Sequence, residues 1–166
     1  MNQRTRIILC YLFVVLFGVF LHFAYGLSGG NPIVGLFTLV NESVWEHLKL
    51  LFFPMLALTL WDLFINYRNN PSFLPARTVG ILSGLVFIVV AFYTITGIIG
   101  IPIAWINILI FLLAVALAFC VERKLQCHKC LFSTTTAIII LIVLIVLFIV
   151  FTIAPPALGI FVPMVG

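Results

Sequence analysis

Residues 137–150 read AIIILIVLIVLFIV, a run in which no side chain carries a polar atom. A helix that crosses a bilayer needs about 20 predominantly apolar residues, and runs of this kind are typical of membrane spans. The whole chain has a similar character: of its 166 residues, 65% are hydrophobic and 7% are charged, and its mean hydropathy is +1.39. Soluble domains contain roughly 45–50% apolar and about 25% charged residues. The composition therefore predicts an integral membrane protein without a soluble domain.

Five segments are long and apolar enough to cross a membrane. They lie at about 6–25, 46–66, 78–98, 102–121 and 134–154. Because helices satisfy their own backbone hydrogen bonds in lipid, we expect an all-α polytopic bundle of about five transmembrane helices, forming a single transmembrane domain over residues 1–166. Arg4 and Arg6 precede the first run as in a signal peptide, but the run continues through Phe23 without a small-x-small cleavage site. We interpret it as a retained span.

Basic residues are unevenly divided between the two sides of the predicted bundle. Seven of the eight lie on the side of the N-terminus, and Lys49 alone lies on the other. The seven are Arg4, Arg6, Arg68, Arg77, Arg123, Lys124 and Lys129. Cytoplasmic segments carry an excess of Lys and Arg, so we expect the N-terminus inside and the C-terminus outside. The lipid bilayer is the expected partner, and the basic residues are too scattered for a nucleic-acid surface.

Polar chemistry is concentrated in residues 41–49, NESVWEHLK, which hold two of the four acids and one of the three histidines. Ionisable groups beside hydrocarbon are costly and often mark function. His22, near the outer end of the first span, is expected at the depth of His47. The sequence therefore predicts a polar pocket at the outer leaflet. Its candidate ligand-binding residues are Glu46, His47, Glu42, His22, Lys49, Asn41 and Trp45.

Several interpretations of this pocket remain open. In the one that we favour, the protein is not an enzyme; Glu46 and His47 bind or conduct a small polar solute or ion, with Glu42, His22 and Lys49 around them. In the alternative, His22, His47 and Glu46 hold Zn²⁺ with water in the open position. The protein would then be a small intramembrane hydrolase acting on lipid-linked substrates. No other cofactor is indicated.

Two further interpretations require no ligand. The pocket can support a partner in the membrane. Alternatively, Ser43 and Glu46 form a capping box at the start of a helix, Glu46 also pairs with Lys49, and Trp45 lies in the aromatic belt. In the helical reading of residues 41–49, Glu42 and Glu46 are four residues apart and share a face.

Three features lie outside the pocket. Ala76, Gly80 and Gly84 form a small-xxx-small ridge that suits close packing against a partner or a second copy. Cys127 and Cys130 form a lone C-x-x-C on the predicted cytoplasmic side, where a redox pair, half of a metal site or acylated cysteines are all compatible with the spacing. Asp62, near the inner end of the second span, is expected to pair with Arg68, Arg6 or Lys124.

Two stretches of sequence resemble a known family. GNPIV at 30–34 and NESVWEHLKLLFFPM at 41–55 resemble a family of small bacterial integral membrane proteins with no assigned function. The resemblance implies a multi-pass protein of the bacterial plasma membrane. It also implies that the polar residues of the second stretch matter, and it supplies no activity. The apolar tail after Pro155 and Pro156 is expected to fold back over the outer face. Residues 31–40 are too apolar for a solvated loop, and we expect them to lie in the interface or to re-enter the membrane.

Overall fold

The computed structural model describes residues 2–66, 72–126 and 132–163 of the chain, and within them all regular secondary structure is helical. The elements are α1 (Gln3–Leu27), α2 (Pro32–Gly35), α3 (Val44–Asn66), α4 (Phe73–Ile99), α5 (Ala104–Gln126), α6 (Thr134–Ile153) and the 3₁₀ turn η2 (Gly159–Phe161). Five of them, α1, α3, α4, α5 and α6, are long and apolar enough to cross a membrane. The prediction of an all-α protein with five candidate spans is confirmed.

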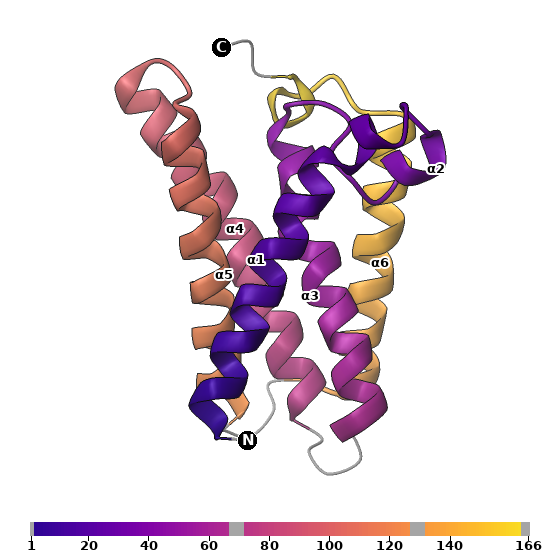
Figure 1. Cartoon of the computed structure of the whole chain (residues 1–166), viewed down its shortest axis with the longest axis vertical. Helices are drawn as coiled ribbons and strands as arrows, with labels where there is room; N and C mark the ends of the chain where they lie inside the picture. The colour runs from indigo at the N-terminus through magenta and orange to yellow at the C-terminus, as the bar shows by residue number, and fades with distance from the viewer. Residues whose placement is uncertain (1, 67–71, 127–131, 164–166) are drawn as a thin grey trace.

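The five long helices run between two faces of the molecule (Figure 1). The N-terminal face carries the start of α1, the end of α3 and the start of α4, and the loop face carries α2, the turn between α4 and α5, and η2. The central helix is α3: 61% of its most apolar stretch is buried, against 17–28% for the other four. A helix that is hydrophobic on all sides belongs in a core, so α3 is the scaffold on which polar side chains are placed.

Small residues bring α4 and α5 together. A Cβ atom on Gly80 would lie 2.5 Å from the carbonyl oxygen of Ala118, and one on Gly84 would lie 3.1 Å from that of Ala114. Ala76 on the same ridge is also buried. The ridge that the sequence suggested for a partner or a second copy is therefore covered by α5 of the same chain, because glycine lets two helix backbones approach closely.

A network of buried charges joins four helices at the N-terminal face. Arg77 Nη2 lies 2.9 Å from Asp62 Oδ2, Arg77 Nε lies 2.6 Å from Glu122 Oε2, and Arg6 Nη2 donates to Asp62 Oδ1 at 2.6 Å. Arg77, Asp62 and Glu122 are each at most 6% exposed. The predicted pairing of Asp62 with Arg6 is confirmed, whereas Arg68 lies outside the described residues, as do Cys127 and Cys130.

The same network explains where the predicted spans were too short. Helix α4 begins at Phe73 instead of about residue 78, and α5 ends at Gln126 instead of about 121. Each extension includes a charged residue, Arg77 or Glu122. A charge usually marks the end of a span because a lone charge in lipid is expensive. Here the two charges neutralise each other, so both helices continue through them.

Candidate functional site

The segment between α1 and α3 is built from local hydrogen bonds. Asn31 Oδ1 accepts from the backbone N–H of Ile33 at 2.9 Å, and Pro32 occupies the first helical position of α2. This is a favourable way to begin a helix, because asparagine caps the free N–H groups and proline has none to satisfy. Helix α2 lies at the loop face (Figure 1). It brings the carbonyl groups of Gly35 and Thr38 to the buried side of α3.

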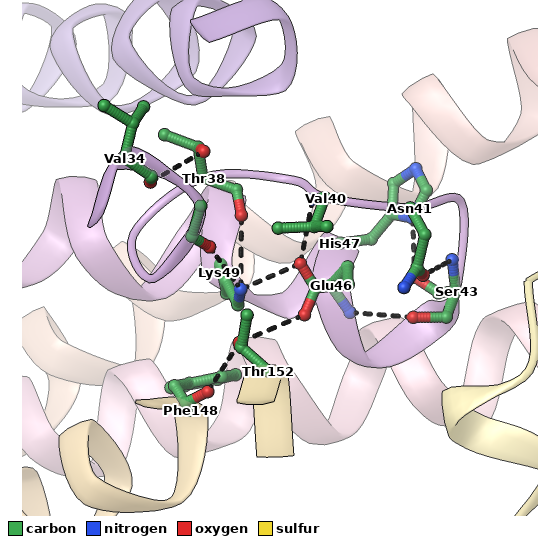
Figure 2. A network of polar contacts seen from close by, with 11 residues as sticks. Val34, Thr38, Val40, Asn41, Ser43, Glu46, His47, Lys49, Phe148 and Thr152 are labelled. Carbon is green, nitrogen blue, oxygen red and sulfur yellow. Dashed lines mark hydrogen bonds and ion pairs between the residues drawn. The ribbon is translucent and has the colours of Figure 1, made fainter. Parts of the chain in front are cut away.

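Lys49 is completely buried and donates to three oxygen atoms (Figure 2). Its Nζ lies 3.0 Å from the carbonyl oxygen of Gly35, 3.2 Å from that of Thr38 and 2.8 Å from Glu46 Oε2. A lysine ammonium has three N–H donors, so the protein itself satisfies all of them. Lys49 therefore fastens the α2 segment to α3, and its ammonium group has no donor left for a ligand.

Glu46 is likewise bound within the protein. Its Oε2 also accepts from the backbone N–H of Val40 at 2.9 Å, and its Oε1 lies 3.3 Å from Thr152 Oγ1 on α6 (Figure 2). The side chain is 3% exposed. Thr152 donates its hydroxyl proton to the carbonyl oxygen of Phe148 at 2.7 Å, so its contact with Oε1 is secondary. Glu46 is therefore a buried side chain that joins the loop to α3 through Oε2, and it is paired with Lys49 rather than placed beside the histidines. Sequence reasoning missed Thr152, which follows an apolar run.

The start of α3 differs in detail from the predicted capping box. Ser43 Oγ accepts from the backbone N–H of Glu46 at 3.3 Å, as expected of an N-cap. The backbone N–H of Ser43, however, is bound by Asn41 Oδ1 at 2.9 Å, because Glu46 reaches back to Val40 instead. The helix begins only at Val44, so Glu42 precedes it and does not share a helical face with Glu46.

Glu42, His22 and His47 form a separate cluster. One potential ligand atom from each of the three residues lies within 4.8 Å of the others. His47 Nε2 is 3.4 Å from Glu42 Oε2, and the ring centroids of His22 and His47 are 5.8 Å apart. The structure thus brings together the two histidines that the sequence paired by depth. The carboxylate beside them is Glu42 rather than Glu46.

Hydrogen bonding orients the ring of His47. Its Nδ1 lies 2.9 Å from the carbonyl oxygen of Ser43. A carbonyl can only accept, so Nδ1 carries the proton and, in the neutral ring, Nε2 presents a lone pair. That lone pair faces the carboxylate of Glu42. Two acceptors at this distance need a cation between them, either a proton on Nε2 or a metal ion.

The separations suit a metal ion of the zinc class. Zn²⁺ binds histidine nitrogen and carboxylate oxygen at roughly 2.0–2.2 Å in tetrahedral geometry, which places neighbouring ligand atoms about 3.4 Å apart. Metal-binding histidines commonly donate their other N–H group to a backbone carbonyl, as His47 does to Ser43. His22 Nδ1 is buried and has no hydrogen-bond partner among the described residues. The cluster therefore has the ligand types and the orientation of a three-ligand site.

A cavity of about 50 Å³ adjoins His47 between α3, α4 and α5. Two of its lining side chains, His47 and Asn107, are polar, and the others are Val44, Leu50, Ile88, Phe92, Ile110 and Phe111. A water molecule needs at least about 10–15 Å³ of such space and several polar partners. The cavity can therefore hold water or a small group beside the cluster.

Trp45, the remaining candidate, faces away from this cluster. Its ring packs against Phe148 and Phe151 of α6 and Phe161 of η2, with centroids 4.8, 5.4 and 5.0 Å apart. These contacts hold the C-terminal tail over the loop face, where the sequence predicted it. Trp45 is therefore an anchor for the tail, and Asn41 supports the cap of α3.

A family model described as "Family of unknown function (DUF6512)" matches residues 1–166. No curated protein and no solved structure matches the chain. The match covers all five candidate spans and the cluster of His22, Glu42 and His47, and it assigns no activity to them.

Proposed function

We propose that this chain, which belongs to the family of unknown function DUF6512, is a multi-pass membrane protein that binds a divalent transition-metal ion through His22, Glu42 and His47. The observation that supports this most directly is the lone pair of His47 Nε2, which faces the Glu42 carboxylate at 3.4 Å with the ring fixed by Ser43. Two imidazoles and one carboxylate are a ligand set that zinc-class ions prefer.

Binding requires a small movement that the exposed side chain can make. The Glu42 side chain is 56% exposed, and that of His47 is 24% exposed. All three ligand atoms lie within 4.8 Å of one another, and rotation of the Glu42 carboxylate can adjust its distances to the two histidines toward about 3.4 Å. Three protein ligands leave a fourth position for water or a small solute, and one of the three, His47, also lines the cavity between α3, α4 and α5.

Metal-dependent hydrolysis is the second candidate, because a three-ligand site with an open position can activate water. A hydrolase also needs a group that accepts a proton from that water. The other carboxylate of the loop face in the described part of the chain, Glu46, is bound to Lys49 and Val40. Because no free base lies near the cluster in the described part of the chain, ion binding is better supported than hydrolysis. We therefore propose that the protein binds a metal ion and is not an enzyme.

The proposed setting is the plasma membrane of a bacterium, with the N-terminal face in the cytoplasm and the tail outside. Among the described residues, the basic side chains at the N-terminal face are Arg4, Arg6, Arg77, Arg123 and Lys124. The loop face has only Lys49 within those ranges, and Glu46 neutralises it. A positive excess marks the cytoplasmic side.

Reporter fusions test this orientation. Alkaline phosphatase fused to the C-terminus should be active, and a fluorescent protein fused there should be dark; the reverse would refute this orientation.

Metal content tests the proposed ion site. The C-x-x-C of Cys127 and Cys130 can bind zinc on its own, so every measurement uses a background in which both are serine. Protein purified in mild detergent is incubated with Zn²⁺ and dialysed, and its metal is counted by mass spectrometry. We expect about one ion per chain, as a single three-ligand site would hold, and loss of most of it in His22→Ala, His47→Ala and Glu42→Gln.

The matched control is Leu16→Ala, which removes an exposed side chain elsewhere on α1 and should leave the metal content unchanged. If the background protein binds no zinc above the control buffer, or if the three variants keep it, the proposed metal site is refuted.

A further inference from the structure

A large groove lies between α1 and α3 on the outside of the bundle, away from the cluster of His22, Glu42 and His47. Its volume is about 700 Å³, within the roughly 300–1,000 Å³ that ligand sites usually occupy. It lies toward the N-terminal face, because Arg6 of α1 and Asp62 of α3 both line it. Because α1 and α3 are candidate membrane spans that end at this face, we expect this end of the groove at the boundary between hydrocarbon and headgroups.

Each wall of this groove is formed by residues along one face of a single helix. On α1 the lining residues are Arg6, Leu9, Cys10 and Phe13, and on α3 they include Leu58, Trp61, Asp62 and Ile65. Both sets follow the i, i+3, i+4, i+7 spacing that aligns side chains along one face of a helix. On α1 the stripe begins with a charge and is apolar over the next two turns, which is about 10 Å along the helix axis.

The groove therefore has the polarity of an amphiphile. Leu9, Phe13, Trp61 and Ile65 are between 43% and 63% exposed, so they present an apolar surface that has no cover within the described chain. The charged end is the Arg6–Asp62 pair. Trp61 also suits this depth, because tryptophan favours the interface of a membrane.

Charge indicates the sign of the headgroup. The Arg6 side chain is 42% exposed and uses Nη2 for Asp62, whereas a guanidinium has five N–H donors. Asp62 is shared with the buried Arg77, which neutralises it from the other side. At the N-terminal face the described residues include five basic side chains and two acidic ones, Asp62 and Glu122. An anion that approaches Arg6 therefore meets a positive surplus.

From these features we propose that the groove between α1 and α3 binds one anionic phospholipid. Its phosphate contacts the free edge of the Arg6 guanidinium, and one acyl chain lies along Leu9, Phe13 and Leu58, which line the groove on the bilayer side of the Arg6–Asp62 pair. Guanidinium groups bind phosphate through paired, charge-assisted hydrogen bonds. This site is independent of the ion that His22, Glu42 and His47 are proposed to hold.

Lipid retention tests the proposal with the full-length protein. Delipidated protein in detergent is titrated with phosphatidylglycerol or with phosphatidylcholine of the same acyl chains, and bound lipid is counted by native mass spectrometry. We expect one phosphatidylglycerol per chain at a concentration about tenfold below that for phosphatidylcholine, the size of effect that one charge-assisted contact gives.

Two variants remove the site in different ways. Arg6→Gln removes the phosphate contact, and Ala57→Phe fills the groove that Ala57 lines while Arg6 and Asp62 remain paired. Both should abolish the preference for phosphatidylglycerol. The controls Arg4→Gln and Ala104→Phe change exposed residues outside the groove and should keep it.

Four outcomes would overturn the proposal. The first is equal binding of the two lipids, and the second is an unchanged preference in both groove variants. The third is full competition by inorganic phosphate at equal concentration, which would mean that the site binds a free anion. If the groove is instead covered by a second copy, native spectra will show dimers without retained lipid, and this too would refute it.

Discussion

Lys49 shows how a charge can be fully buried beside hydrocarbon. Its ammonium group contacts one carboxylate and two backbone carbonyl groups, and no part of the residue is exposed. Lys49 also satisfies the carbonyl groups of Gly35 and Thr38, and this stabilises the fold because a buried backbone oxygen without a donor would destabilise it. The residue therefore serves the loop at least as much as it serves α3.

Replacement of Lys49 tests this role. Lys49→Met should lower the free energy of unfolding by about 3–5 kcal/mol, since it leaves the buried Glu46 carboxylate unpaired. Reversible unfolding in mixed micelles, followed by circular dichroism, measures the change. The double variant Lys49→Met/Glu46→Leu should recover part of the loss, because apolar side chains can replace a buried pair. If the double variant is less stable than Lys49→Met, the pair is not the cause.

Also at the residue scale, the sequence predicted the two histidines as neighbours and named both Glu42 and Glu46 as candidates, with Glu46 as the carboxylate of a metal site, whereas the carboxylate beside the histidines is that of Glu42. Depth along the spans was enough to pair His22 with His47. The choice between Glu42 and Glu46 depended on where α3 begins, and the local pattern allowed a start at Asn41 or at Val44. Because the helix begins at Val44, Glu42 points to the histidines from the loop, whereas Glu46 is drawn to Lys49 and to Thr152, a residue 106 positions away.

Among the elements, the hairpin of α4 and α5 depends on backbone contact. The nearest atom to a Cβ on Gly80 is a carbonyl oxygen at 2.5 Å, and a backbone atom cannot turn aside as a side chain can. The sequence showed the small residues but not which helix would cover them, because a ridge of glycine and alanine fits any neighbouring helix. The short turn from Ile99 to Ala104 makes α5 the nearest one.

A single methyl group probes this contact. Gly80→Ala should destabilise the protein by about 1–3 kcal/mol, the usual cost of overpacking, as measured by the midpoint of unfolding in the same micelles. Gly97→Ala is the matched control on the same helix, because a Cβ there meets nothing within 4 Å. It should be neutral or stabilising by up to about 1 kcal/mol, since alanine is the better helix former. Equal effects at both positions would contradict close packing at Gly80.

The tail is an element held by one aromatic cluster. Trp45→Ala removes the ring that contacts Phe148, Phe151 and Phe161, so η2 should separate from α3. Limited proteolysis with chymotrypsin should then cleave near Phe161 several-fold faster, because local opening controls such cleavage. Trp105→Ala, at a residue that is 64% exposed, should leave the rate unchanged. An unchanged rate in Trp45→Ala would show that other contacts hold the tail.

Across the whole molecule, a buried ionic group lies near each end of the central helix. The Glu46–Lys49 pair connects α3 to the loop and to α6, and the Arg77 network connects it to α1, α4 and α5. Composition predicted five helices but could not predict this arrangement, because each pair in the Arg77 network joins residues on different helices. A hydropathy scale scores each charged residue separately and takes no account of the partner that neutralises it.

Arg77 is the centre of the network, and its loss should affect the entire bundle. Arg77→Gln leaves two carboxylates buried together, so it should cost about 3–5 kcal/mol or more of unfolding free energy. Lys124→Gln, an exposed residue two positions from Glu122, should change stability by less than about 0.5 kcal/mol. Similar stability of the two variants would mean that the buried network does not hold the helices together.

The order in which these charges occur along the chain matters for how the protein is made. Asp62 follows its partner Arg6, Arg77 follows Asp62, Glu122 follows Arg77, and Lys49 follows Glu46. Synthesis runs from the N-terminus, so each of these later charges meets a counter-charge that is already in place. Arg6 is made before its partner Asp62, but its side chain is half-exposed and can reach the headgroups until Asp62 is in place. The chain can therefore enter the membrane one helix at a time, because no deeply buried charge depends on a helix that has not yet been made.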